Sequence, residues 1–249
     1  MKAIISDIHS NLEALEAVLE DIESRKITEI FCLGDIIGYG PDPMKCLELM
    51  RKHSSIVIKG NHEEAALSAP IDFNAKAASA ILWTRECIDE APPGDSRASL
   101  EFLEGLAEKH TDNGILMVHG SPRQPTRDYL FPREIHDAAR MQELFGMIDH
   151  YCFLGHTHIP GVFTQDGTYD HPNNMTMKGI YLLDEQKAMI NVGSVGQPRD
   201  GDTRACYCTF DGDSVVFRRV AYDVQTTVRK IYANRRLDNA LGDRLKEGR

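Results

Sequence analysis

The sequence predicts an α/β fold that contains a second sheet, and three observations support this prediction. Short apolar runs rich in Ile and Val recur along the chain, and such runs are typical of buried strands. Helical patterns separate the early runs, and alternating strands and helices are the signature of an α/β domain. After residue 158 the alternation gives way to further strand-like segments, which we assign to a second sheet.

Each early apolar run ends in a polar cluster. Residues 3–5 lead into 6–9, 30–33 into 34–35, 55–58 into 60–63, 115–118 into 119–120, and 151–154 into 155–158. In α/β folds ligands bind beyond the carboxyl ends of the strands. The five clusters are therefore expected to lie near one another and to form a site.

Two helices are expected between the first three runs. Apolar residues recur at nearly helical spacing over 11–24, where Asn11 is a suitable N-cap, and residues 43–53 begin with a Pro-rich turn. A helical insert of about residues 64–112 then interrupts the alternation. Its segment 74–89 is rich in Ala, a Pro-Pro-Gly sequence at 92–94 breaks it, and 99–109 resumes the helical pattern.

The second half of the chain is expected to be mostly strands. The candidates are residues 179–183, 188–192, 205–210 and 214–220, with a hairpin turn at 211–213. From Val224 onward we predict one charged C-terminal helix that frays at residues 246–249. A length of 249 residues suits a single domain over 1–249 with the helical insert at one side.

Composition and charge restrict the classes of function. The net charge of -10 argues against a protein that grips nucleic acid by its backbone, although a local positive site can lie in an acidic protein. Neither a targeting segment nor a membrane-spanning run is visible, so we expect a cytoplasmic protein without a membrane partner. The six cysteines are scattered, which favours reduced thiols over disulfides or a zinc site, and Cys206 and Cys208 should share one face of a strand.

The polar clusters carry the candidate chemistry. Taken singly, Asp7 and His9 could form a strand-end turn, and His119 could be an ordinary buried histidine. The clusters at 60–63 and 155–158 are more specific, because each places several ligand-type side chains at one strand end. Five of the ten histidines lie in the clusters. Buried imidazoles at this density are costly unless something satisfies them, and a metal ion does so well.

The order of the clusters resembles that of the calcineurin-like metallophosphoesterases. The matching motifs are Asp7-x-His9, Gly34-Asp35-x-x-Gly38, Gly60-Asn61-His62-Glu63, Val118-His119-Gly120 and Gly155-His156-x-His158. The resemblance spans residues 3 to about 160. Residues 191–200 resemble the small bacterial and archaeal members, including those grouped with phosphodiesterases and diadenosine tetraphosphate hydrolases. The resemblance implies a four-layer α/β/β/α sandwich of two mixed sheets flanked by helices.

The resemblance also implies a pair of divalent metal ions. The first would be held by Asp7, His9 and His158, Asp35 would bridge the two, and Asn61, His119 and His156 would complete the second. Oxygen and imidazole ligands without thiolate suit Mn²⁺, Fe, Zn²⁺, Co²⁺ or Ni²⁺, of which Mn²⁺ is our first choice. The positive charge of two such ions exceeds the negative charge of Asp7, Asp35 and a bridging hydroxide. The centre would therefore be net positive and would attract a phosphate anion.

The implied reaction is hydrolysis of a phosphate monoester or diester by a metal-bridging hydroxide. His62 would protonate the leaving group and Glu63, where many members carry Asp, would stabilise the protonated ring. His62 could instead be a simple phosphate-binding donor. Arg123 and Arg199 are candidates for binding substrate phosphate, and either could equally hold a loop through backbone carbonyls.

Two other classes of function compete with this enzyme. A catalytically silent scaffold of the same fold would act as a protein-binding module, and retention of His62 and all seven ligands argues against it. A nuclease would need a basic track, which the acidic residues at 200–202 do not suggest. The expected partner is a small phosphorylated substrate, with nucleotides favoured by the resemblance alone. No feature of the sequence demands a particular oligomeric state.

Overall fold

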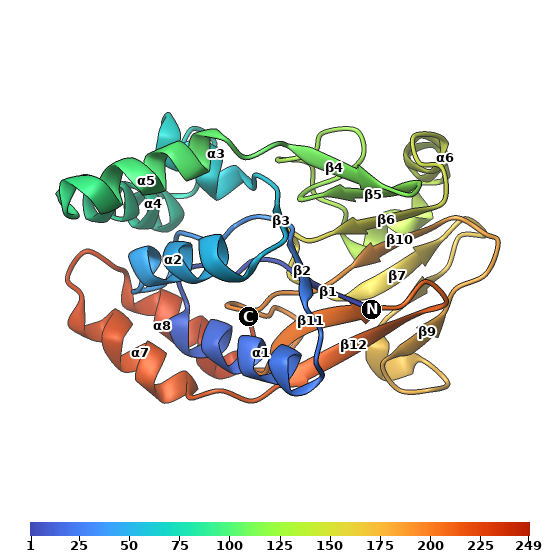
Figure 1. Cartoon of the computed structure of the whole chain (residues 1–249). Coiled ribbons are helices and arrows are strands. Elements are labelled where there is room, and N and C mark those ends of the chain that lie inside the picture. Colours follow the sequence, from blue (N-terminus) through green and yellow to red (C-terminus); the bar gives the residue numbers. More distant parts are fainter.

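The computed structural model describes residues 1–249 as two six-stranded sheets with helices around them (Figure 1). The first sheet has the order β3-β2-β1-β11-β12-β9. Its strands are β1 (Lys2–Ile5), β2 (Glu29–Cys32), β3 (Ile56–Val57), β9 (Ile180–Leu182), β11 (Ala205–Phe210) and β12 (Ser214–Val220). The second has the order β4-β5-β6-β10-β7-β8. Its strands are β4 (Lys109–Asp112), β5 (Ile115–Val118), β6 (Tyr151–Leu154), β7 (Gly161–Thr164), β8 (Tyr169–Asp170) and β10 (Ala188–Asn191).

Both sheets are mixed, and each has a parallel centre. β1, β2 and β3 are parallel, while β11 pairs with β1 in the antiparallel sense. In the second sheet β6 lies between β5 and β10 and is parallel to both. The parallel strands therefore direct their carboxyl ends, and the polar clusters that follow them, to one edge of each sheet.

The alternation of side chains along each strand divides the core into layers. In β1, Ala3 and Ile5 pack against the helices, while Ile4 faces the other sheet. Phe31 of β2 and Phe153 of β6 meet Ile4 in this inter-sheet core. Because successive residues of a strand point to opposite faces, a continuous apolar run can fill both layers at once.

Helices cover the outer faces of both sheets. The helices are α1 (Leu12–Ser24), α2 (Pro43–His53), α3 (Asn61–Leu67), α4 (Ala75–Glu90), α5 (Pro93–Glu104), α6 (Ala138–Gly146), α7 (Val224–Ala233) and α8 (Asn239–Glu247). The apolar residues of α1 and α2 pack on the first sheet and those of α6 on the second (Figure 1). Short 3₁₀ helices occupy Pro132–His136 and Pro172–Asn174. The predicted four-layer α/β/β/α architecture is confirmed.

Four details differ from the sequence prediction. The late strands were assigned to a second sheet, but β9, β11 and β12 lie in the first sheet and only β10 lies in the second, because β11 pairs with the distant β1 and a local pattern does not encode that pairing. The C-terminal segment forms two helices instead of one, because the chain turns at residues 234–238 and Asp238 caps α8 through the backbone N–H of Ala240. The end of the predicted helical insert is a strand, since residues 109–112 pair with β5. The strands β7 and β8 were not predicted, because they are only four and two residues long and lack a distinctive pattern.

Other sequence predictions are confirmed. Asn11 caps α1, and the turn at 211–213 joins β11 to β12 as a hairpin. All six cysteines are free, and Cys206 and Cys208 both face the inter-sheet core.

None of the helices has the length and apolar character needed to cross a bilayer.

Candidate metal centre

Five strand-end loops bring the seven predicted metal ligands together in the interior. Asp7 and His9 follow β1, Asp35 follows β2, Asn61 begins α3 after β3, His119 follows β5, and His156 and His158 follow β6. Every one of these side chains is buried, and none is more than 7% exposed. Six of them form the groups Asp7/His9/His158 and Asp35/His119/His156, each with its ligand atoms within 4.8 Å of one another. A third group of the same kind, His9/Asp35/His62, links these two.

The backbone turns sharply at most of these positions. Asp7, His9, Asp35, His156 and His158 all have a positive φ, between 49° and 66°. This left-handed conformation costs an L-residue about 1–2 kcal/mol. The fold therefore sustains local strain at five of the seven candidate ligands, which is typical of a functional site.

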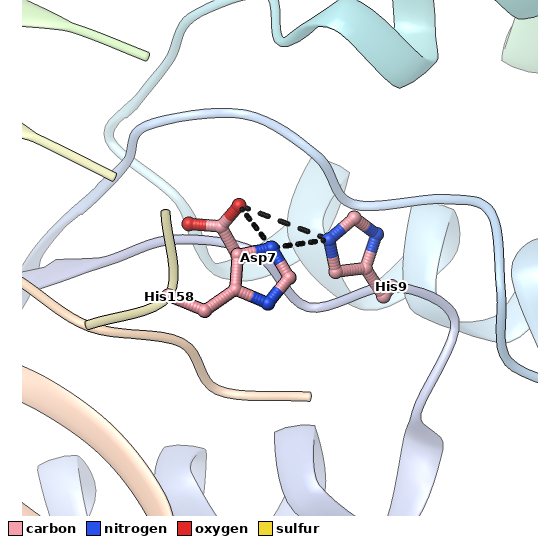
Figure 2. A group of neighbouring side chains, drawn as sticks. All are labelled: Asp7, His9 and His158. Atoms are coloured by element: carbon pink, nitrogen blue, oxygen red, sulfur yellow. Dashed lines mark hydrogen bonds and ion pairs between the residues drawn. The ribbon is translucent and has the colours of Figure 1, made fainter. Parts of the chain in front are cut away.

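Figure 2 shows the first group, in which Asp7 and two histidines converge. The Nε2 atoms of His9 and His158 are 3.1 Å apart, and the Nε2 of His158 is 3.1 Å from the Oδ1 of Asp7. The Nδ1 atoms face backbone carbonyls, at 3.2 Å from Ile37 for His9 and 2.6 Å from Gln197 for His158. An Nδ1 that faces a carbonyl must carry the proton, so each Nε2 presents a lone pair to the centre.

The second group repeats this arrangement around His119. Its Nδ1 lies 2.9 Å from the carbonyl of Leu33, while its Nε2 is 2.9 Å from the Nδ1 of His156 and 3.2 Å from the Oδ1 of Asn61. The Oδ2 of Asp35 is 3.2 Å from the Nε2 of His119 and 3.7 Å from that of His9. Asp35 therefore lies between the two groups.

These donor atoms suit cations. Lone pairs of two neutral imidazoles that face each other at 3.1 Å repel unless a positive charge lies against them. The Oδ1 of Asp7 is buried and accepts no hydrogen bond. Burial alone would lower the pKa of His119, but the carboxylates of Asp35, Asp7 and Glu63 together raise that pKa to about 9. The centre thus attracts positive charge, and the two groups of ligands fit a pair of divalent metal ions.

His62 lies beside this centre without belonging to either of the two groups described. Its Nε2 is 3.9 Å from the Oδ2 of Asp35, and its buried Nδ1 has no hydrogen-bond partner. Burial is the main cause that lowers the pKa of His62 to about 4. Gly38, at a φ of +86°, leaves room for this ring, because a Cβ there would lie 2.0 Å from the Nδ1 of His62.

Glu63 has a different set of partners from the one expected. Its carboxylate accepts backbone N–H bonds from Asp35 at 2.7 Å, Ile36 at 2.8 Å, Ile37 at 3.3 Å and Gly60 at 2.9 Å. No hydrogen bond or ion pair joins it to the His62 ring, so the expectation that Glu63 stabilises the protonated ring is corrected. The physical reason is that α3 begins at Asn61 and directs the Glu63 side chain back toward the Asp35 loop.

The two candidate arginines lie in different surroundings. Arg199 follows the Gly-rich loop, where its guanidinium carbon is 6.0 Å from the ring centre of Tyr39 and its buried Nε has no partner. Its charge contributes to lowering the pKa values of His62 and His158. Arg123 instead forms ion pairs with Asp128 at 3.1 Å and Glu143 at 3.4 Å. Arg123 thus holds its own loop through carboxylates, whereas Arg199 donates to the side-chain oxygen of Gln197 at 2.8 Å and lies near Tyr39.

Sequence reasoning missed the aromatic residues around the centre. Tyr39 lies 4.7 Å from the rings of both His9 and His62, Phe73 packs edge-on against His62 at 5.2 Å, and Tyr129 stacks on His156 at 3.7 Å. Only Tyr39 could have been recognised from the sequence, because it lies between two glycines directly after the Asp35 motif. A pocket of about 340 Å³ opens here. Its lining residues are Tyr39, Asn61, Ile71, Asp72, Phe73, Asn74, Gln124, Arg127, Tyr129 and His156.

Comparisons with known proteins agree with this geometry. Residues 1–214 match the model of the calcineurin-like phosphoesterase superfamily domain. An uncharacterized protein of Methanocaldococcus jannaschii is 42% identical over 100% of this chain and 98% of its own. The crystal structure of a metallophosphoesterase from Sphaerobacter thermophilus superposes with a TM-score of 0.83 at 36% identity, covering 100% of this chain and 98% of that one.

A third relative is more distant and is named for a specific substrate. The symmetrical bis(5'-nucleosyl)-tetraphosphatase of Methylobacillus flagellatus is 26% identical over 59% of this chain and 53% of its own length. The matched family model covers most of the chain and includes all seven candidate ligands. The chain therefore belongs to the calcineurin-like phosphoesterase superfamily, and it is a phosphoesterase hydrolase.

Proposed function

We propose that this protein hydrolyses the phosphate ester of a small molecule at a two-metal centre. The observation that supports this most strongly is the position of Asp35 between the two histidine groups, at 3.2 Å from His119 and 3.7 Å from His9. One carboxylate shared by two sets of imidazole and oxygen ligands is the arrangement expected of a pair of cations. Asp7, His9 and His158 would hold one ion, Asn61, His119 and His156 the other, and Asp35 both.

The cations would supply Lewis acidity and a water of lowered pKa at neutral pH. Mn²⁺ remains our first choice, because the donors are carboxylate, amide and imidazole without thiolate. The buried site keeps bulk water from the reacting phosphate, and the Arg199 guanidinium adds a positive charge that would bind a phosphoryl oxygen.

We further propose that His62 donates a proton from its imidazole to the oxygen of the leaving alcohol. The ring lies 3.9 Å from Asp35, at the side of the centre and next to the pocket wall formed by Phe73. This position, between the shared carboxylate and the pocket wall, suits a side chain that donates to the leaving oxygen. Glu63 is a positioning residue in this proposal, since it fixes the backbone of the Asp35 loop.

The substrate is proposed to be a small phosphorylated compound, with nucleotides the leading class. The pocket of about 340 Å³ accommodates a group of nucleoside size. The distant relative named as a bis(5'-nucleosyl)-tetraphosphatase adds weight to this class. The six free cysteines support a reducing compartment, so we propose a cytoplasmic location.

Hydrolysis assays with defined metals test the proposed function. The purified protein, stripped of metal and reloaded with Mn²⁺, should hydrolyse p-nitrophenyl phosphate or bis(p-nitrophenyl) phosphate and lose this activity with a chelator. A panel of Mn²⁺, Fe²⁺, Zn²⁺, Co²⁺ and Ni²⁺ should rank Mn²⁺ first. Binding of about two ions without hydrolysis of any ester would support the scaffold alternative and contradict the proposal.

A further inference from the structure

The side chains that line the pocket next to the metal centre indicate a particular class of substrate. This inference about the substrate rests on the proposed phosphoesterase function. Two of its lining residues, Asn61 and His156, are also candidate metal ligands, so the pocket opens directly onto the reacting phosphate. Its outer walls come from residues 71–74 before α4 and from residues 124–129 after β5. A group that fills this space would lie next to a phosphate bound at the centre.

The walls are aromatic and remain open to solvent. Tyr129 is 42% exposed and is stacked on His156 with the two rings 3.7 Å apart and 24° from parallel. Phe131 is parallel to Tyr129 within 6°, at 5.3 Å, and supports it. Ile71, at the opposite rim, is 65% exposed. Exposed apolar side chains that converge on a concave polar site are typical of a surface that a ligand covers.

Three of the polar side chains that line the pocket, Asn61, Asn74 and Gln124, are neutral amides. The Oδ1 of Asn74 accepts from the N–H groups of Lys76 and Ala77 as the cap of α4, which leaves its NH₂ group to donate. The side-chain amide of Gln124 makes no hydrogen bond within the protein. Amides that can both donate and accept match the edge of a planar heterocycle, whereas a second phosphate would call for free cations.

The one cation of the pocket is already neutralised. The Arg127 guanidinium binds Glu64 through its Nε at 3.0 Å and its Nη2 at 2.9 Å, and its Nη1 lies 4.0 Å from Asp72. Arg127 thereby ties the 124–129 loop to α3 and to the 71–74 loop. The ion pair with Glu64 leaves little positive charge for the ligand, which again favours an uncharged group.

We propose that this pocket binds a planar aromatic group, in the first place a nucleobase, carried by the alcohol that leaves from phosphorus. The ring would pack against the part of Tyr129 that His156 and Phe131 leave exposed, and its polar edge would meet Asn74 and Gln124. Phe73 joins the pocket wall to His62, which places the leaving alcohol beside the proposed proton donor. In the reaction a water oxygen bonds to phosphorus and releases a proton to solvent. The bond from phosphorus to the alcohol oxygen breaks, that oxygen takes a proton from His62, and His62 regains a proton from solvent.

Matched pairs of phosphate esters test this assignment. Adenosine 5'-monophosphate and ribose 5-phosphate share the same primary alcohol and differ by the base. Benzyl phosphate and cyclohexylmethyl phosphate differ by the flatness of one ring. Each is measured as a competitive inhibitor of bis(p-nitrophenyl) phosphate hydrolysis by the Mn²⁺-loaded enzyme. Because contact of one base with an aromatic side chain changes affinity by about fivefold or more, the planar member of each pair should inhibit at least about fivefold more strongly.

Variants of Tyr129 test whether this side chain causes the preference for planar inhibitors. Tyr129→Leu should bring both ratios close to one by weakening the planar inhibitors, with little change for ribose 5-phosphate and with the metal content unchanged. Tyr129→Phe should keep both ratios. Tyr232→Leu is the matched control, because Tyr232 is a tyrosine of similar exposure, at 41%, on α7 and outside the pocket. The wild-type enzyme could prefer adenosine 5'-monophosphate to ribose 5-phosphate without preferring benzyl phosphate to cyclohexylmethyl phosphate. That result would identify recognition of the polar edge of the base.

The outcomes separate failure of this inference from failure of the proposed function. Equal inhibition within both pairs by the wild-type enzyme would overturn the inference even if Tyr129→Leu does not fold. Absence of hydrolysis of every ester would contradict the phosphoesterase proposal, and calorimetric titration of the same pairs into the Mn²⁺-loaded protein would still decide what the pocket binds.

Discussion

The candidate ligands owe their orientation to backbone carbonyls rather than to other side chains. His9, His119 and His158 each direct Nδ1 at a main-chain oxygen, of Ile37, Leu33 and Gln197 respectively. This contact fixes the tautomer and aims Nε2 at the centre. The same rings lie within about 3 Å of other imidazoles, His9 next to His158 and His119 next to His156. The contact between Nδ1 and a carbonyl therefore keeps each ring in the orientation that ion binding needs.

At the residue scale, replacing His62 separates proton donation from metal binding. We expect His62→Ala to keep its metal content and to lose turnover by about 10²–10⁴-fold, because a proton donor contributes about that much. The loss should be larger for alkyl than for p-nitrophenyl esters, since p-nitrophenolate leaves without a proton. Steady-state rates and metal analysis measure both quantities.

The leaving-group dependence distinguishes the two roles considered for His62. An equal loss for alkyl and p-nitrophenyl esters would indicate a phosphate-binding donor instead of a general acid. His53→Ala, at an exposed position near the end of α2, serves as the control and should leave the rates unchanged.

At the element scale, the first turn of α1 is joined to the Gly-rich loop that supports His158. Asn11 caps α1 through the N–H of Ala14 and also donates to the carbonyl of Gly196 at 2.8 Å. Its Oδ1 further accepts from Thr227 of α7 at 3.0 Å. The next residue of the loop, Gln197, holds the Nδ1 of His158. One side chain therefore connects a helix cap, a C-terminal helix and a metal-site loop.

We expect Asn11→Ala to lower both stability and metal affinity. Loss of a helix cap costs about 1 kcal/mol, and each buried polar group left without a partner costs about 1–3 kcal/mol more. Thermal unfolding and titration with Mn²⁺ measure the two effects. Asp238→Ala is the matched control, since it removes the cap of α8 away from the centre. An unchanged Mn²⁺ affinity in Asn11→Ala would contradict the link between this cap and His158.

At the scale of the whole molecule, the centre joins both sheets. Asp7 and Asp35 belong to the first sheet, His119 and His158 to the second, and the ligand groups combine residues from both. The C-terminal helices α7 and α8 pack with Tyr39 and α4 in one apolar cluster. These contacts support our proposal that residues 1–249 form a single domain, although the family model ends at residue 214.

Because both sheets supply ligands, metal binding should stabilise the fold as a whole. At a free concentration of about 100 times Kd, one ion adds about 2.7 kcal/mol, which raises Tm by about 5–10 °C for a domain of this size. Thermal unfolding with Mn²⁺ and with a chelator measures this shift. His158→Ala should remove much of it and His53→Ala none; a Tm that does not respond to any divalent ion would contradict the metal centre.

The sequence by itself determined the strand-end clusters, the family and the seven candidate ligands. It could do so because strand periodicity is local, and because Asp, Asn and His in a fixed order restrict the chemistry. It also anticipated the cap at Asn11 and the hairpin at 211–213.

Only the tertiary structure decided the partners of the remaining side chains. Glu63 turned out to bind the Asp35 loop, Arg123 to pair with Asp128, and Tyr129 to stack on His156. These contacts join residues from different loops or depend on the exact turn of one loop, and neither spacing nor composition encodes them. A local pattern can specify which atoms are available, whereas the packing of distant segments determines what those atoms meet.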